Sequence, residues 1–266
     1  TAHLEFIKKR KGILQEKSQM IQDMKNGGTI ILNGDDDLLS RMGPVKGIDP
    51  VFFGISEDCE FYASDLKSAG LRGTECTLHL PSGESFRCLV PLPGIHMISN
   101  ALAGAAVGYS LGLTSEEIKQ GIENLPSMPG RNNIISTDKL VILDDCYNAN
   151  PISTKASIDV LTMAIGRKVA ILGNMGELGE GEKQLHFEIG AYAASQKIDL
   201  ICGIGELAKY IIAGAKDDPV TETLWFKTKE DFLDAMKNII REGDNVLVKA
   251  SHGMQFPKLV DALKEL

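Results

Sequence analysis

Two adjacent carboxylates open the part of the sequence that is richest in polar side chains. Asp144 and Asp145 follow an apolar run and begin the string Asp-Asp-Cys-Tyr-Asn-Ala-Asn-Pro, residues 144–151. Carboxylates at the end of a strand can accept hydrogen bonds from ribose hydroxyls or hold a metal ion. Asp and Asn also satisfy the backbone of an ordinary strand-to-helix connection. The residue types alone leave both interpretations open.

A second candidate is the glycine-rich stretch 173–181, Gly-Asn-Met-Gly-Glu-Leu-Gly-Glu-Gly. Glycines let backbone N–H groups approach an anion closely and form a nest at the start of a helix. The stretch is neither a G-x-G-x-x-G fingerprint nor a phosphate-binding loop, so a flexible connection is an equally good interpretation. No GxxxxGK[S/T] motif occurs anywhere in the 266 residues.

Three further places have residue types suited to nucleotide or metal binding. Asn100 lies in a segment rich in Ala and Gly, residues 94–103, where it could pair with a base edge or cap a tightly packed helix. His3 and Lys17 precede the acidic run Asp35–Asp37. A lone His is more often structural than a ligand, and a lone Lys on a helix is usually solvated, so these residues alone define no site.

A regular alternation of elements after Arg131 must position most of these groups. Apolar strands are expected at 140–143, 169–172, 200–203, 223–226 and 246–248, and helices at 153–164, 185–196, 207–215, 229–240 and 257–266. This alternation predicts an α/β fold with a Rossmann-like, doubly wound parallel sheet. Such sheets bind ligands outside the carboxyl ends of their strands. We therefore expect the functional loops at 144–151, 173–182, 203–206 and 249–253.

The first half of the chain has a more mixed pattern. We expect a helix at 13–24, strands at 29–32 and 51–55, and β-rich material at 60–90 with a hairpin of 76–80 and 85–90. Helices at 98–111 and 115–124 follow, and Thr114 with Glu117 predicts a capping box for the second. The change of pattern predicts two domains, residues 1–131 and 132–266.

Composition restricts the class of protein. The chain has 28 Lys and Arg against 36 Asp and Glu, a net charge of −8, which argues against a non-specific nucleic-acid binder. Its longest apolar runs fall short of the roughly 18 residues of a membrane span, and no secretory signal is visible. Five cysteines without CxxC spacing argue against structural zinc and favour a reducing cytoplasm. The first residue is not Met, so we expect a processed, truncated or incompletely ordered chain.

Taken together, these segments resemble the Mur ligases, the ATP-dependent amide ligases of peptidoglycan precursor synthesis. The matching pieces occur in the family's order at residues 2–5, 16–18, 33–35, 93–103, 129–131, 144–151, 172–179 and 249–251. The string at 144–151 is the most informative of them. Folylpolyglutamate synthases and the relatives that add diaminopimelate or lysine carry a His-containing version there. The resemblance is therefore to the branch that adds D-Ala-D-Ala.

The resemblance implies that this chain is a piece of a longer protein. Mur ligases have three domains, and residues 1–131 resemble the C-terminal part of the central ATPase-type domain. Residues 132–266 resemble the whole C-terminal, Rossmann-like domain. The domain that grips the UDP-sugar and the phosphate-binding loop have no counterpart here. We expect a monomeric enzyme of the bacterial cytoplasm, without nucleic-acid binding or a membrane span, and expect these 266 residues to be inactive alone.

The family's functional residues map onto this sequence position by position. Lys17 matches a lysine that is carbamylated and so gains a carboxylate for Mg²⁺, and His3 matches a second residue of that metal site; both are candidate catalytic residues. For ATP, Asn100 matches an adenine contact, Arg131 a phosphate contact and Asp145 the carboxylate that binds the ribose. The substrate face implied by the resemblance consists of Tyr147, Asn148, Asn150, Asn174, Ser251 and His252.

The implied reaction passes through an acyl phosphate. The terminal carboxylate of UDP-N-acetylmuramoyl-tripeptide attacks the γ-phosphorus of ATP, and the amine of D-Ala-D-Ala then displaces phosphate. Two alternatives are a sister Mur-type ligase that adds another amino acid and a non-catalytic nucleotide- or partner-binding module. Met97, Asn174 and His252 stand where Asn, Asp and Arg are common, which weakens the assignment of the dipeptide more than that of the family.

Overall fold

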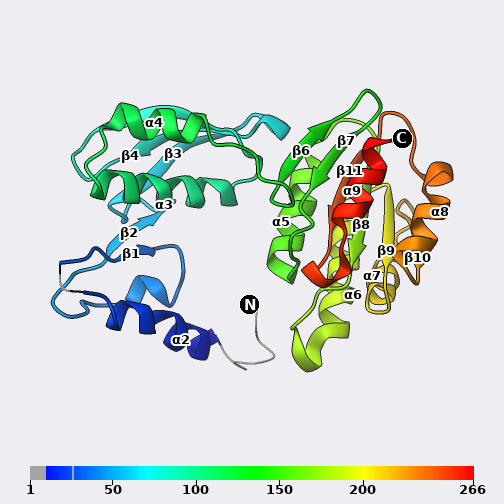
Figure 1. The fold of residues 1–266 in the computed structure, drawn as a ribbon, viewed down its shortest axis with the longest axis horizontal. Coiled ribbons are helices and arrows are strands. Elements are labelled where there is room, and N and C mark those ends of the chain that lie inside the picture. The colour runs from blue at the N-terminus through cyan, green and yellow to red at the C-terminus, as the bar shows by residue number, and fades with distance from the viewer. Residues whose placement is uncertain (1–9, 26) are drawn as a thin grey trace. The chain divides into compact units, whose positions relative to one another are not determined.

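The computed structural model describes residues 10–25 and 27–266, and the contacts divide these residues into two units (Figure 1). The smaller unit ends at Pro126 and the larger unit begins at Ser127. Residues 127–131, which we expected to end the first domain, therefore pack with the larger unit. Gly130 is an example, because its N–H donates to the carboxylate of Asp144.

The larger unit is built on a six-stranded sheet of order β10-β9-β8-β11-β7-β6. Five of its strands run parallel: Val141–Asp144 (β7), Lys168–Gly173 (β8), Leu200–Ile204 (β9), Glu222–Phe226 (β10) and Asn245–Lys249 (β11). This arrangement confirms the predicted parallel sheet. The strand Asn133–Ser136 (β6), which was not expected from the sequence, pairs antiparallel with β7 at the edge of the sheet.

Helices cover both faces of this sheet (Figure 1). Pro151–Thr162 (α5), Glu182–Ser195 (α6) and Ala208–Ala215 (α7) follow β7, β8 and β9, while Lys229–Ile239 (α8) and Pro257–Lys264 (α9) pack on a shared core on the other face. Strands β9 and β11 are buried over their whole length, as expected for strands covered on both faces. Helices α6 and α7 pack so closely that a Cβ on Gly190 would lie 1.8 Å from the carbonyl oxygen of Ile211.

The smaller unit contains a five-stranded sheet of order β1-β2-β3-β4-β5. Ile31–Asn33 (β1), Val51–Gly54 (β2) and Phe61–Ser68 (β3) are parallel, and Thr74–His79 (β4) and Ser85–Val90 (β5) continue the sheet antiparallel. His96–Ser110 (α3) and Ser115–Glu123 (α4) share a core with this sheet. The predicted hairpin and the predicted capping box of Thr114 and Glu117 are both confirmed.

The remaining α-helix lies near the start of the described residues. Arg10–Gln22 (α2) begins and ends earlier than the helix expected at 13–24. The residues that the structure describes also form four short 3₁₀ helices: Leu39–Arg41 (η1), Gly70–Arg72 (η2), Gly179–Gly181 (η3) and His252–Met254 (η4). Two of them, η3 and η4, lie in the loops after β8 and β11, where we expect function.

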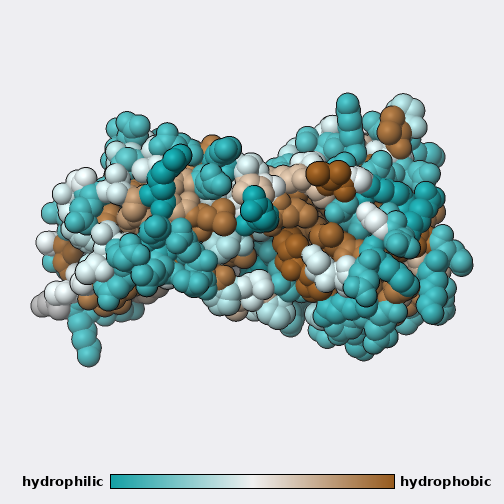
Figure 2. Space-filling model, turned by 90° about the horizontal axis from the view of Figure 1, so that it is seen from above, coloured by the Kyte–Doolittle hydropathy of each residue, from teal (hydrophilic) through white to brown (hydrophobic). Residues whose placement is uncertain are grey.

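On the face seen in Figure 2, both units are mainly hydrophilic, with apolar patches between the polar side chains. Large apolar side chains exposed on the larger unit include Met128, Ile152 and Ile165. Exposed apolar residues are common on folded proteins. None of the helices that the structure describes is long and apolar enough to cross a bilayer.

Candidate nucleotide and substrate site

The carboxyl edge of the six-stranded sheet gathers most of the expected site residues. Strands β7, β8, β9 and β11 are parallel neighbours in the sheet order, so the loops that follow them leave from one edge. The expected residues that belong to the larger unit are Arg131, Asp145, Tyr147, Asn148, Asn150, Asn174, Ser251 and His252. Lys17 and Asn100 belong to the smaller unit.

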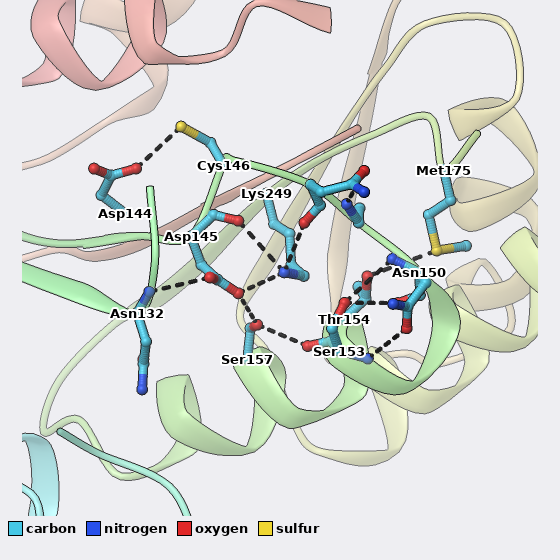
Figure 3. Close-up of polar contacts among 12 residues, drawn as sticks. Asn132, Asp144, Asp145, Cys146, Asn150, Ser153, Thr154, Ser157, Met175 and Lys249 are labelled. Atoms are coloured by element: carbon cyan, nitrogen blue, oxygen red, sulfur yellow. Dashed lines mark hydrogen bonds and ion pairs between the residues drawn. The ribbon is translucent and has the colours of Figure 1, made fainter. Parts of the chain in front are cut away.

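The two adjacent carboxylates have different surroundings. Asp144 is buried, and its carboxylate accepts hydrogen bonds from the Gly130 N–H at 2.7 Å and from the Cys146 thiol at 3.0 Å. The side chain of Asp145 is 18% exposed. Its Oδ1 accepts from the Asn132 N–H at 3.0 Å and its Oδ2 from the Ser157 hydroxyl at 2.6 Å (Figure 3). Asp144 thus holds the preceding turn, and Asp145 is the carboxylate that a ligand can reach.

Lys249, at the end of β11, supplies the positive charge beside Asp145 (Figure 3). Its Nζ lies 2.5 Å from Asp145 Oδ2, 3.1 Å from the carbonyl oxygen of Asn148 and 3.4 Å from that of Asp145. Burial lowers the pKa of Lys249, and the charge of Asp145 opposes that shift. From the sequence, Lys249 was expected only as part of the loop 249–253 and of the family-matching piece 249–251, without a role of its own. A lysine directly after the apolar run Val246–Val248 was the available signal.

Cys146 is not a reactive thiol in this arrangement. Its side chain is buried, and burial together with the hydrogen bond to Asp144 raises its pKa well above the usual range. Nucleophilic cysteines have lowered pKa values. Cys146 therefore serves to fix Asp144, and the string at 144–151 offers oxygen acceptors and amides as its functional groups.

Arg131, Tyr147 and His252 form an exposed group of one cation and two rings. The Arg131 guanidinium carbon lies 4.0 Å from the centre of the Tyr147 ring, a distance at which a cation is attracted to the face of the ring. The Tyr147 and His252 ring centres are 5.4 Å apart. A cavity of about 160 Å³ lies beside these rings, with Asp144 and Gly130 in its lining. This group is open to a ligand at the edge of the sheet.

Asn174 and Ser251 use their side-chain oxygens within the protein. Asn174 Oδ1 accepts hydrogen bonds from the N–H groups of Leu207 and Ala208, at 3.0 and 3.1 Å, where α7 begins. Ser251 Oγ accepts from the Gly176 N–H at 2.7 Å, and the Ser251 N–H donates to the Asn174 carbonyl at 3.0 Å. The two residues thereby connect the loops after β8, β9 and β11.

Asn150 and Asn148 also shape the backbone. Asn150 is the N-cap of α5: its Oδ1 accepts from the Ser153 N–H at 2.9 Å, and Ser153 Oγ accepts from the Asn150 N–H at 3.2 Å. Asn148 Oδ1 accepts from the Ala149 N–H at 2.9 Å, and the Asn148 side chain is exposed. The capping box fixes the end of the 144–151 loop, and Asn148 is the amide at its surface.

His186 is a buried residue of this edge that the sequence analysis missed. Its Nε2 accepts a hydrogen bond from the Met175 N–H at 2.8 Å, and its Nδ1 lies 2.6 Å from the carbonyl oxygen of Glu182. These partners require a neutral ring with the proton on Nδ1. Burial lowers the pKa of His186, which favours that neutral form. The ring therefore fixes the glycine-rich loop at Met175, and the spacing of residues gives no signal for such a contact.

The expected metal residues have no described cluster around them. Lys17 is an exposed residue of α2, and His3 lies outside the described residues. Within residues 10–25 and 27–266, no group of three or more His, Cys, Asp or Glu side chains could hold a metal ion. Asn100 is exposed on α3, and its Nδ2 donates to the sulfur of Met97 at 3.5 Å. The assignment of Mg²⁺ to Lys17 and His3 stays a prediction.

Comparison with known proteins defines the class to which this fold and this edge belong. The family described as "Mur ligase middle domain" matches residues 1–108, and "Mur ligase, glutamate ligase domain" matches residues 130–252. Both descriptions are of the same family of ligases, and they match consecutive parts of the chain. The chain belongs to the Mur ligase family.

Two curated relatives within this family are similar to the chain over nearly its whole length. The UDP-N-acetylmuramoyl-tripeptide–D-alanyl-D-alanine ligases of Bacillus subtilis (strain 168) and Escherichia coli (strain K12) are each 32% identical to the chain over 99% of its length. The chain covers 57% and 58% of these two proteins, less than two thirds of either.

Solved structures agree with these relatives. The crystal structure of MurF from Acinetobacter baumannii superposes with a TM-score of 0.89 and 29% identity, covering 100% of this chain and 58% of that one. MurF from Thermotoga maritima, solved in complex with ADP, superposes with a TM-score of 0.83 and 25% identity, covering 99% of this chain and 59% of that one. The fold of this chain is therefore that of the corresponding part of MurF.

Proposed function

We propose that the chain is part of an ATP-dependent ligase that joins D-Ala-D-Ala to UDP-N-acetylmuramoyl-tripeptide in the bacterial cytoplasm. The observation that carries the proposal is Asp145, a carboxylate held at the carboxyl end of β7 by a buried lysine and two hydrogen-bond donors. Relatives named for this reaction are 32% identical over nearly the whole chain. In this proposal residues 1–131 complete a central ATPase domain, and residues 132–266 form the C-terminal domain of a monomeric enzyme.

Asp145 is proposed to accept a hydrogen bond from the ribose of ATP. A carboxylate has about four acceptor positions, and Asn132, Ser157 and Lys249 use three of them in this structure. The remaining position, on Oδ1, suits one ribose hydroxyl. A second hydroxyl could bind only if the Ser157 hydroxyl turned away to its other partner, the carbonyl oxygen of Ser153.

The other ATP contacts are proposed from the resemblance and from exposure. Arg131 is exposed and carries a charge suited to phosphate oxygens, and Asn100 is exposed and carries an amide suited to the edge of adenine. A binding measurement with Arg131→Ala should show weaker ATP binding, with the loss reduced at high salt because the contact is between charges.

The substrate face is proposed to divide into groups that touch the substrate and groups that shape the loops. Tyr147, Asn148 and His252 are exposed and are proposed to meet the dipeptide or the acyl phosphate. Asn150, Asn174 and Ser251, whose side-chain oxygens are engaged internally, are proposed to present backbone groups to the substrate.

Lys17, as a carbamate, and His3 are proposed to bind Mg²⁺. A carbamate supplies the oxygen ligands that Mg²⁺ prefers, and the exposed Lys17 amine is open to CO₂. When bound, the ion would neutralise charge on the phosphate oxygens. Lys17→Ala should abolish turnover, with partial recovery in the presence of a short carboxylate. A fully active Lys17→Ala enzyme would remove the carbamate from the proposal.

The test is phosphate release by the protein extended upstream through its native reading frame, with the 266-residue chain beside it. The reaction contains ATP, Mg²⁺ and UDP-N-acetylmuramoyl-tripeptide, with and without D-Ala-D-Ala. We expect release that depends on the dipeptide in the long form and none in the short form. Turnover with another amino acid only would indicate a sister ligase. No turnover with any amino acid would favour a non-catalytic binding module.

A further inference from the structure

Lys249 stands at the carboxyl end of β11, yet its ammonium group is turned into the protein (Figure 3). We propose that Lys249 is a positioning residue that holds Asp145 and the 144–151 loop in place for the nucleotide, without contacting the nucleotide itself. The inference rests on the proposed function, because it takes Asp145 to be the ribose-binding carboxylate.

The contacts of the ammonium leave no hydrogen for a ligand. A lysine ammonium has three N–H donors, and three oxygens lie within reach of Lys249 Nζ: Asp145 Oδ2, the Asn148 carbonyl and, at 3.4 Å, the Asp145 carbonyl. The side chain is 2% exposed. A phosphate could take one of these hydrogens only by breaking an internal bond and opening the loop.

The sheet fixes the backbone from which Lys249 extends. β11 lies between β7 and β8, with Val248 opposite Asp144 and Lys249 opposite Leu172. The Asp145 N–H continues the ladder by donating to the Val248 carbonyl at 3.1 Å. The side chain of Lys249 therefore reaches sideways from a rigid central strand to the loop after its neighbour.

The same strand also sets the next loop. Two residues after Lys249, Ser251 binds the backbone of Asn174 and Gly176 in the loop after β8. The 144–151 loop, which carries the proposed ribose carboxylate, and the glycine-rich loop after β8 are thus both held by side chains at the end of β11. Lys249 makes its contact through a charged ammonium group, whereas Ser251 makes its contacts through a neutral hydroxyl and its backbone N–H.

The charges nearby predict what happens when Lys249 is lost. Arg131 is close enough for its positive charge to lower the pKa of Lys249. Without the ammonium, the partly exposed Asp145 carboxylate loses its fixed partner and is attracted to the exposed Arg131 side chain. Asp145 would then release the Asn132 N–H and present its oxygens in more than one direction. ATP binding would weaken, while groups at the reacting atoms would stay in place.

The opposite end of the sheet provides a matched control. Arg167 Nη1 lies 2.8 Å from the buried carboxylate of Asp244, the residue just before β11. Arg167→Met therefore removes an ion pair at the amino end of β11, the end opposite to Lys249. Lys249→Met is the corresponding change at the carboxyl edge. If Lys249→Met does not fold, Lys249→Gln keeps a neutral donor in the same space.

Hydrogen exchange of the 266-residue chain tests the positioning without any reliance on catalysis. In the Lys249 variant, the amide of Asn132 and the amides of 144–151 should exchange at least about tenfold faster than in the wild type, because their local structure opens more often. Arg167→Met should leave these amides unchanged and affect residues 241–245. Unchanged exchange at Asn132 in the Lys249 variant would overturn the proposal.

Steady-state kinetics of the upstream-extended protein then separate positioning from chemistry. We expect Lys249→Met to raise the KM for ATP about tenfold and to change kcat by less than about threefold, with both constants of Arg167→Met within about twofold of the wild type. A kcat that falls more than a hundredfold at unchanged KM would instead make Lys249 a catalytic residue. If the wild type is inactive while the exchange result holds, the proposed function fails and the positioning role stands.

Discussion

Strand β11 carries an ion pair at each end, and the two pairs have opposite arrangements. At the carboxyl end the cation, Lys249, is 2% exposed and the anion, Asp145, is 18% exposed. At the amino end the anion, Asp244, is 1% exposed and the cation, Arg167, is 20% exposed. One edge of the sheet therefore offers a partly open carboxylate, and the other buries its carboxylate completely.

This difference supports the proposed binding role of Asp145 and a structural role for Asp244. Asp244 Oδ2 accepts from both Arg167 and the Arg241 N–H, each at 2.8 Å, and so closes the turn between α8 and β11. Asp145 keeps an acceptor position that none of the residues the structure describes uses. Parallel sheets bind ligands at the carboxyl edge, which is the edge of Asp145. Because the cation rather than the anion is buried at this edge, the Asp145 carboxylate is partly exposed and the Asp244 carboxylate is not.

The largest effect is expected from Asp145→Ala. This change removes the proposed ribose acceptor, worth about 1.5–3 kcal/mol per charge-assisted bond, and leaves the buried Lys249 ammonium without its counter-charge. ATP affinity of the extended protein should fall by at least about tenfold, and the free energy of unfolding by about 3–5 kcal/mol. ATP titration and urea unfolding measure the two losses. An unchanged ATP affinity would take Asp145 out of the site.

Asp244→Ala should affect stability alone. Arg167 is partly exposed and can turn to water, so the expected loss in the free energy of unfolding is about 1–3 kcal/mol, smaller than for Asp145. The KM for ATP and kcat should stay within about twofold of the wild type. A fivefold change in ATP affinity would contradict the separation of the two edges.

His186 should make the carboxyl edge sensitive to pH. Its pKa is lowered in the folded protein by burial, so below about pH 6.5 the unfolded chain binds a proton that the native ring does not. Stability should therefore fall as the pH drops below that value, and His186→Gln should remove this component. The free energy of unfolding, measured with urea between about pH 5 and 7.5, tests this prediction. The same dependence of that free energy on pH in the wild type and in His186→Gln would contradict it.

The smallest effect is expected from His252→Ala. His252 is exposed, so its loss should change the free energy of unfolding by no more than about 0.5 kcal/mol. If His252 meets the dipeptide, the KM for D-Ala-D-Ala should rise while the KM for ATP does not. A loss of stability greater than about 1 kcal/mol would show that the side chain supports the edge instead.

The sequence predicted the elements of this edge better than the contacts within it. Five apolar strands alternating with helices were sufficient for the parallel sheet and for the loops at its carboxyl edge. The edge strand β6 was not predicted because Ile134 and Ile135 are a short apolar run without alternation. The turn from β6 to β7 also depends on a side-chain contact, in which Thr137 Oγ1 accepts from the Leu140 N–H.

The missed contacts join residues that are far apart in the chain. Lys249 and Asp145 are separated by 104 positions, and Ser251 and Gly176 by 75. No local pattern specifies which side chain of one loop meets which backbone group of another. Asn174 and Ser251 were predicted as substrate contacts from the family resemblance, and the structure shows that their side-chain oxygens hold neighbouring loops. Composition cannot separate a polar group that binds a ligand from one that holds a loop.

ATP affinity of the upstream-extended protein tests the central claim most directly when Asp145→Asn and Asp244→Asn are compared. Both changes replace a carboxylate by an amide of the same shape at one end or the other of the same sheet. We predict that Asp145→Asn weakens ATP binding by at least about tenfold and that Asp244→Asn changes it by less than about twofold. Equal effects of the two changes, or no effect of Asp145→Asn, would contradict a nucleotide site at the carboxyl edge.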